Sequence, residues 1–217
     1  MVQQKVLADR LIAGQGILWD AARVAAANLM LVLCAWIALP LPWTPVPLTG
    51  QTFGVMLVAV LLGSRRGAIV LGLYLLEGLA GLPVFQPYGL PGLARLAGPT
   101  AGYLLAYPAA AFLTGWLVER IRGHHDAVGS LLRLGGALLA GELVTFAGGC
   151  AWLALMPLAT SNGTLAAMGW SRAFAAGLLP FLPGELIKMA LVGAAVRGVE
   201  RGIGVAEDSA GRTSRKD

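Results

Sequence analysis

Long apolar segments run through this 217-residue chain, and they restrict its possible folds more than any other feature of the sequence. Hydrophobic residues make up 57% of the chain and charged residues 12%, whereas soluble domains carry roughly 25% charged residues. In a bilayer the backbone must satisfy its own hydrogen bonds, and about 20 apolar residues in a helix cross the hydrocarbon core. The sequence therefore predicts an all-α integral membrane protein that crosses the cytoplasmic membrane several times.

Six apolar runs are candidate membrane spans, and the second and third are shorter than the usual length. Proline-rich residues 40–47 separate the first two runs, and residues 81–99, rich in glycine and proline, separate the third from the fourth. Proline lacks an amide donor and ends helices, so we expect irregular loops there and a break in the last run near residues 180–183. The predicted spans cover residues 24–39 (with a backward extension to residue 18 left open), 51–63, 67–80, 100–118, 131–156 and 174–196.

The whole chain, residues 1–217, is expected to form one membrane domain. No unit of 20–50 residues repeats, which excludes a solenoid. Residues 1–20 are expected to form a cytoplasmic tail or an interfacial helix, residues 21–200 a six-helix bundle, and residues 201–217 a polar cytoplasmic tail, disordered beyond Gly204. The charged start of the chain has no small-residue cleavage pattern close behind it, so we expect no cleaved signal peptide.

Basic residues set the expected orientation. If both tails and the even-numbered connectors lie in the cytoplasm, that side holds thirteen of the sixteen Lys and Arg residues. The opposite side holds only Arg95 and Arg172, and Lys188 lies within the membrane. Because cytoplasmic loops carry an excess of basic residues, we expect both termini in the cytoplasm and an even number of spans. The asymmetry also accounts for the pI near 9.7 and gives no reason to expect nucleic-acid binding.

Glu185 and Lys188 lie three residues apart inside the last apolar run, which carries no other charge between residues 174 and 196. Ionisable residues at membrane depth are costly, and they face a partner, a cavity or a ligand. Pro183 suits the first turn of a helix, which would place Glu185 near the positive helix terminus and both side chains on one face. Two interpretations stay open: an internal ion pair, or the polar end of a ligand pocket.

The expected topology brings the proline-rich loop, the glycine-rich loop and the start of the last span to one outer face. Trp43, Phe85 and Tyr88 lie on these loops, and Gln51 begins the second span. Aromatic residues at this depth form either an interfacial belt or the apolar wall of a ligand pocket. The amide of Gln51 either caps its helix or donates to and accepts from a ligand.

The remaining polar residues do not indicate an enzyme or a metal site. Glu77 and Glu142 lie within apolar runs and are interpreted as structural, and His124 and His125 lie in a charged, solvated connector. The two cysteines have neither metal-site nor disulfide spacing. No G-x-S-x-G, H-E-x-x-H or phosphate-loop motif occurs. We therefore expect no enzyme activity, and an ATP-driven cycle would need a separate chain.

Four segments occur in an order that is specific in combination. They are residues 45–53 (Pro-Val-Pro-Leu-Thr-Gly-Gln-Thr-Phe), 81–85 (Gly-Leu-Pro-Val-Phe), 98–104 (Gly-Pro-Thr-Ala-Gly-Tyr-Leu) and 180–188 (Pro-Phe-Leu-Pro-Gly-Glu-Leu-Ile-Lys). Together they resemble the BioY family, the biotin-specific substrate-binding (S) components of energy-coupling factor (ECF) transporters. The resemblance implies a six-helix S-component fold, biotin held near the outer face and no cofactor. It also implies a transmembrane coupling (T) protein and ATPase subunits as partners, although some family members occur without dedicated partners.

The resemblance places Glu185 and Lys188 at the family's acidic and basic ligand positions. Glu185 stands where the family commonly carries Asp, and Ala101 where a second glycine is usual. Residues 86–88 replace small, glycine-like residues with Gln-Pro-Tyr. These departures bear on the shape of the pocket more than on its ligand. The candidate substrate-binding residues are Trp43, Thr49, Gln51, Phe85, Tyr88, Tyr103, Glu185 and Lys188.

The chemistry of biotin fits the charged pair in two ways. Glu185 can accept from the ureido N–H groups while Lys188 donates to the ureido carbonyl or to the carboxylate. In the reverse assignment, Lys188 binds the carboxylate of the valerate tail and Glu185 only restrains Lys188. The sequence does not choose between these assignments.

The first span carries alanines four residues apart at its cytoplasmic end. Such small-xxx-small faces let helices pack closely, and in S components such a face contacts the coupling protein. Internal packing is the alternative. The candidate interface residues are Ala21, Ala22, Ala25 and Ala26.

The expected function is high-affinity biotin binding and uptake. The alternative within the same class is an S component for another vitamin. From other classes, the alternatives are an intramembrane enzyme or a structural membrane scaffold.

Overall fold

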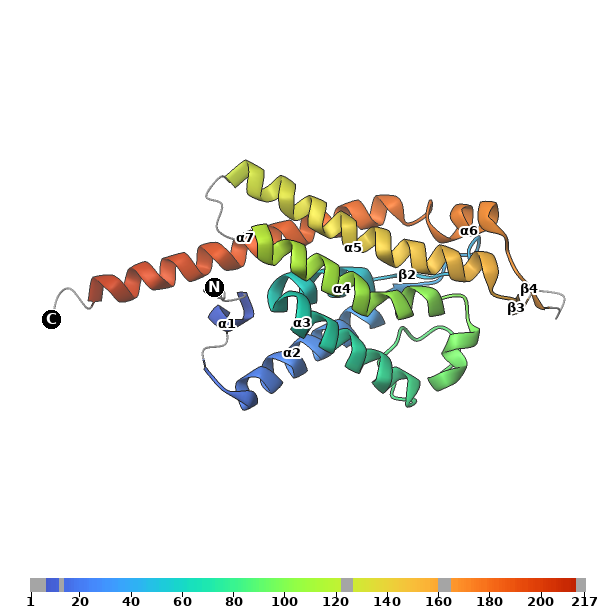
Figure 1. Cartoon of the computed structure of the whole chain (residues 1–217), viewed down its shortest axis with the longest axis horizontal. Coiled ribbons are helices and arrows are strands. Elements are labelled where there is room, and N and C mark those ends of the chain that lie inside the picture. The colour runs from blue at the N-terminus through green and yellow to red at the C-terminus, as the bar shows by residue number, and fades with distance from the viewer. Residues whose placement is uncertain (1–6, 12–13, 122–126, 160–164, 214–217) are drawn as a thin grey trace.

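The computed structural model describes residues 7–11, 14–121, 127–159 and 165–213, and most of them are helical (Figure 1). The predicted apolar runs are mainly helical, although the first run ends as a helix at Trp36 and its last two residues, Ala38 and Leu39, form a strand. The elements in chain order are α1 (Leu7–Leu11), α2 (Ile17–Trp36), β1 (Ala38–Leu39), β2 (Leu48–Thr49), α3 (Gln51–Leu79), the 3-10 helix η1 (Gly92–Ala97), α4 (Ala101–Ile121), α5 (Ala127–Leu155), β3 (Leu158–Ala159), β4 (Leu165–Ala166), α6 (Trp170–Gly177) and α7 (Leu182–Thr213).

Helix α3 is two short arms joined at Gly63, whose φ of 79° and ψ of −172° are not helical. A methyl group placed on Gly67 would lie 3.4 Å from the Cα of Ala59. In a straight helix, residues eight apart would lie about 12 Å apart along the axis. The chain therefore folds back on itself at Gly63, and the predicted runs 51–63 and 67–80 are the two arms of this hairpin.

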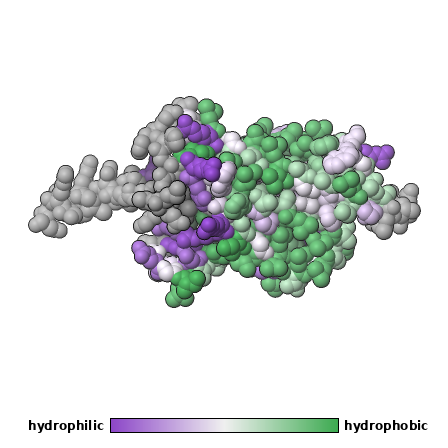
Figure 2. All heavy atoms as spheres, viewed as in Figure 1, coloured by the Kyte–Doolittle hydropathy of each residue, from purple (hydrophilic) through white to green (hydrophobic). Residues whose placement is uncertain are grey.

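Charged side chains gather at one end of the apolar body, beside the turn of α3 (Figure 2). Asp9 of α1 accepts from Arg66 Nη1 at 2.6 Å and lies 3.3 Å from Arg23 Nη1. Asp20 pairs with the same two arginines at 2.8 Å each. At the turn itself, the carboxylate of Glu119 accepts from the backbone N–H of Ser64 at 2.7 Å. These contacts hold α1 and α4 against the hairpin.

Two short strand pairs were not expected from an all-α prediction. β1 pairs antiparallel with β2, with Ala38 opposite Thr49, and β3 pairs antiparallel with β4, with Leu158 opposite Ala166. Each strand has two residues. The prolines of residues 40–47 cannot continue a helix, so the chain satisfies backbone groups at the base of this loop by pairing across it. The fold is therefore helical with two small hairpins.

Large apolar side chains cover the flank of the molecule as a broad band (Figure 2), as expected of a surface that faces lipid. Within the described residues, four helices are long and apolar enough to cross a membrane: α2, α3, α4 and α5. Helices α6 and α7, bent by 50° at the break between them, could form a fifth crossing. The predicted number of six spans is reached only if the two arms of α3 are counted separately.

The ends of the chain differ in part from the prediction. Residues 7–11 form the short helix α1, and α2 already begins at Ile17. Helix α7 continues to Thr213, so residues 205–213 are helical where a disordered tail is expected. Extending an existing helix is easier than starting one, and residues 197–213 contain no proline that would end it.

The turn at Gly63 gives a first test of the fold. We expect Gly63→Ala to lower stability by about 1–3 kcal/mol, because only glycine adopts this backbone conformation without strain. Gly72→Ala, in the second arm, is the matched control: nothing lies within 4 Å of the added methyl group, and alanine favours a helix. Thermal unfolding in detergent should show opposite shifts for the two variants. Equal midpoints would contradict a glycine-dependent turn.

Candidate functional site

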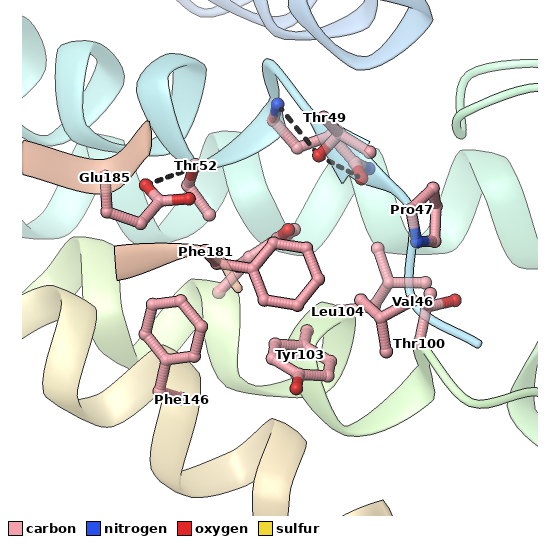
Figure 3. Close-up of a pocket in the computed structure, with 12 residues that line it drawn as sticks. Val46, Pro47, Thr49, Thr52, Thr100, Tyr103, Leu104, Phe146, Phe181 and Glu185 are labelled. Atoms are coloured by element: carbon pink, nitrogen blue, oxygen red, sulfur yellow. Dashed lines mark hydrogen bonds between the residues drawn. The ribbon is translucent and has the colours of Figure 1, made fainter. Parts of the chain in front are cut away.

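A small cavity lies between the helices at the start of α3, the end of its first arm that is far from the turn at Gly63. Figure 3 shows the residues that line it. Its volume is about 40 Å³, and we call it the inner cavity. Figure 3 shows Glu185 and Thr52 at one end of the group and Pro47 and Thr100 at the other. The lining residues are Val46, Pro47, Thr49, Gln51, Thr52, Thr100, Tyr103, Leu104, Tyr107, Phe146, Phe181 and Glu185.

The polar end of the inner cavity is a closed network of three side chains. Lys188 Nζ donates to Glu185 Oε1 at 2.7 Å and to the hydroxyl of Thr52 at 2.9 Å. The same hydroxyl donates to Glu185 Oε2 at 2.7 Å. Thr52 belongs to α3 and the other two residues to α7, so the network joins two helices. Lys188 is held behind Glu185 and is not among the residues that line the cavity.

The start of α7 explains where Glu185 points. The helix begins at Leu182 with Pro183 in its first turn, as the sequence predicts, and Glu185 is the acidic residue of that turn. The positive end of the helix dipole stabilises a carboxylate there. The backbone N–H of Glu185 donates to the carbonyl of Phe181 at 2.9 Å. Glu185 is therefore both buried and electrostatically supported.

Gln51 and Thr49 form the second polar group of the cavity. The Gln51 side-chain amide donates to the hydroxyl of Tyr74 at 2.7 Å, and its backbone N–H donates to the hydroxyl of Thr49 at 3.3 Å. Thr49 in turn donates to Gln51 Oε1 at 3.4 Å. Both residues stand at the junction of β2 and α3, so the strand pairing positions them.

The middle of the cavity is aromatic. Tyr103 and Phe146 meet edge to face with ring centroids 6.0 Å apart, and Phe181 lies 6.4 Å from Phe146. The Tyr103 hydroxyl donates to the carbonyl of Gly177 at 2.6 Å, so the ring has a fixed orientation. Rings held in this way form an apolar wall suited to a small ring system.

A larger cavity adjoins the inner one, and both have Pro47 and Thr100 in their walls. Its volume is about 340 Å³, and we call it the loop cavity because loop residues make most of its lining. Its residues are Pro45, Pro47, Gln86, Tyr88, Gly89, Leu90, Arg95, Ala97, Gly98, Pro99, Thr100 and Met168.

The predicted site residues divide between these places. Thr49, Gln51, Tyr103 and Glu185 line the inner cavity, and Tyr88 lines the loop cavity. Lys188 belongs to the network behind Glu185.

Two predicted residues line neither cavity. Trp43 is 68% exposed, as in the alternative of an interfacial belt. Phe85 is buried against Tyr74, with ring centroids 5.2 Å apart. The ring of Phe85 packs in the core because Gly78 has no side chain there. A methyl group on Gly78 would lie 2.1 Å from Phe85 Cζ.

Sequence reasoning missed Thr52, Phe146 and Phe181 as site residues. Thr52 directly follows Gln51 in the segment 45–53, and Phe181 lies four residues before Glu185 in the segment 180–188. Their closeness to predicted site residues could have indicated that they belong to the site. Phe146 sits in the middle of an apolar run, and nothing in the sequence separates it from other core aromatics.

The other polar residues occupy separate environments. Glu77 accepts from Asn28 Nδ2 at 2.6 and 2.7 Å, which ties α3 to α2. Glu142 is buried, and its Oε2 has no hydrogen-bond partner among the described residues. His124 and His125 lie outside the described residues. The four alanines of the predicted interface, Ala21, Ala22, Ala25 and Ala26, are all exposed on α2.

An apolar helical body with a cavity that is polar at one end and aromatic in the middle defines a multi-pass membrane protein that holds a small molecule. The model of the BioY family matches residues 5–204, and the chain therefore belongs to the BioY family.

Two relatives are similar over most of their length. The biotin transporter BioY of Rhizobium etli is 40% identical over 161 residues, which cover 72% of this chain and 80% of that protein. The biotin transporter BioY of Rhodobacter capsulatus is 37% identical over 154 residues, which cover 71% and 78%.

A solved structure shares the fold. It is the crystal structure at 2.1 Å of the S-component for biotin from an ECF-type ABC transporter, with a TM-score of 0.70 and 27% sequence identity. The match covers 85% of this chain and 92% of that chain.

Proposed function

We propose that this protein binds biotin with high affinity as the substrate-specific component of an ECF-type transporter, and that it serves biotin uptake rather than an enzymatic reaction. The relatives named as biotin transporters and the structural neighbour described as an S-component for biotin support this proposal.

The observation that carries the proposal is the inner cavity, which has a buried carboxylate at one end and aromatic rings beside it. The two ureido N–H groups of biotin need an acceptor, and a carboxylate gives hydrogen bonds roughly twice as strong as a neutral acceptor. Glu185 is that acceptor, with its orientation fixed by Thr52 and Lys188. The bicyclic ring then lies against Tyr103, Phe146 and Phe181.

The charged pair provides the test of this proposal. We expect Glu185→Ala and Lys188→Ala each to weaken biotin binding by at least about tenfold, because each leaves a buried charge unpaired. Leu186→Ala, between them on α7 and 65% exposed, should bind like the wild type. Equilibrium binding of labelled biotin to purified protein measures the effect. Wild-type affinity in both folded charge variants would show that the pair is structural and the ligand lies elsewhere.

We further propose six membrane crossings with both termini in the cytoplasm, the two arms of α3 counting as separate spans. The charged end beside Arg65 and Arg66 then faces the cytoplasm and the loop cavity faces outward, in accord with the excess of basic residues expected inside.

Orientation can be tested by labelling single cysteines in a variant with Cys34→Ala and Cys150→Ala. We expect a membrane-impermeant reagent added outside intact cells to label Trp43→Cys, which replaces a side chain that is 68% exposed. The reagent should reach Arg65→Cys, also at an exposed position, only after the cells are permeabilised. Labelling of Arg65→Cys in intact cells would reverse the orientation.

The coupling protein and ATPase subunits are proposed partners, and the exposed alanine face of α2 is their proposed contact. Exposure of Ala21, Ala22, Ala25 and Ala26 favours a partner over internal packing, since small residues on an open face let another helix approach closely. The neighbouring Ala27 is 6% exposed and packs inside, so the two kinds of alanine are distinct.

We expect Ala22→Trp or Ala26→Trp to abolish biotin uptake in cells supplied with the coupling proteins, while the purified variants still bind biotin. A bulky ring separates close-packed helices, but the inner cavity lies toward the other end of the molecule. Leu143→Trp, at a 63% exposed position of α5, is the control and should leave uptake intact. Loss of binding together with uptake would show that the face packs internally, and unchanged uptake would exclude it as the coupling contact.

A further inference from the structure

Arg95 is a buried cation held by the loop residues that line the loop cavity. It lies in η1 and is 6% exposed. Its Nη1 donates to the carbonyl of Tyr88, its Nη2 donates to the carbonyl of Gln86 at 3.0 Å, and its Nε is buried without a partner in the described residues. Its Cζ lies 5.5 Å from the centre of the Phe85 ring. Neutral carbonyls and a ring orient this guanidinium, but they do not neutralise its charge.

Two other basic residues with little exposed surface, Arg23 and Lys188, do have carboxylate partners. Arg23 pairs with Asp9 and Asp20, and Lys188 pairs with Glu185. Within the described ranges, Arg95 is the buried basic residue that has no carboxylate within 4 Å. Burial lowers the pKa of its guanidinium, although arginine stays charged in proteins. A buried charge that lacks a counter-charge is strongly unfavourable.

Arg95 is also in the right place to meet a ligand that extends beyond the inner cavity. It lines the loop cavity, which adjoins the inner cavity at Pro47 and Thr100. The inner cavity, at about 40 Å³, has room for only about three water molecules. A ligand that places only a polar edge against Glu185 must therefore extend into the loop cavity, which Arg95 lines.

We propose that Arg95 is a specificity-determining residue that supplies the positive charge for the carboxylate of the bound ligand. The inference rests on the proposed function, because it takes the ligand to be biotin, whose valerate tail ends in a carboxylate. It also chooses between the two assignments that the sequence leaves open: Lys188 is already neutralised by Glu185 at 2.7 Å and does not line either cavity. Glu185 therefore binds the ureido end, and Arg95 attracts the tail.

The test compares biotin with biotinol, in which a primary alcohol replaces the carboxylate. We expect wild-type protein to prefer biotin by about tenfold or more, because charge-assisted hydrogen bonds are the strong ones. Arg95→Gln should reduce the preference to about threefold or less without weakening biotinol binding, whereas Arg95→Lys, which keeps the positive charge, should retain most of it. Arg172→Gln, at an exposed arginine on α6, should leave the preference unchanged.

Each failure has a distinct meaning. If the wild type binds neither compound, the proposed function fails. If it binds both equally, the function stands and the role of Arg95 is overturned. If Arg95→Gln loses both ligands, Arg95→Lys decides: recovery of biotinol binding with a restored preference for biotin supports the charge role. Recovery of binding without that preference shows that Arg95 only holds the loop carbonyls.

Discussion

The network of Glu185, Lys188 and Thr52 is the interaction on which the membrane part of this structure depends. A carboxylate or an ammonium left alone at that depth is unfavourable by several kcal/mol. Lys188 and Glu185 neutralise each other, but the geometry needs Thr52, whose hydroxyl accepts from one and donates to the other. Because Thr52 belongs to α3, the electrostatics of α7 fix where the first arm of α3 lies. The walls of the inner cavity follow from that position.

The glycine turn in α3 separates two chemically different ends. Folding back at Gly63 leaves Arg65 and Arg66 beside the turn, while Gln51, at the far end of the first arm, lines the inner cavity. At the turn, Arg66 forms ion pairs with Asp9 of α1 and Asp20 of α2. At the other end, loops with few charges surround the cavities. One backbone conformation thus keeps solvated charges and ligand groups apart.

The sequence predicted these features unequally, and the reasons are physical. Apolar length located every long helix, and Pro183 correctly placed Glu185 in the first turn of α7, because both signals are local. The hairpin of α3 could be seen only as two short runs, since the conformation of Gly63 depends on contacts with α4. Trp43 and Phe85 show the same limit: whether a loop aromatic faces outward, the core or a ligand depends on which residues lie opposite, such as Gly78. Phe146 likewise belongs to the site because of a residue distant in the sequence, Phe181, whose ring lies beside it.

Leaving one buried charge open has a physical consequence for selectivity. A site in which every charge is paired internally gains stability, but it responds little to the charge of its ligand. A site with an unpaired donor rejects analogues that lack the matching group, because the donor then stays buried and unpaired. At the Glu185 end, which we propose binds the ureido group, Lys188 and Thr52 already bond to the carboxylate, which favours a fixed shape. At the other end, Arg95 donates hydrogen bonds to loop carbonyls, but no carboxylate of the described residues neutralises its charge. In the proposed complex, α7 contacts the ring of the ligand and η1 supplies the charge for its tail, so the two elements discriminate independently.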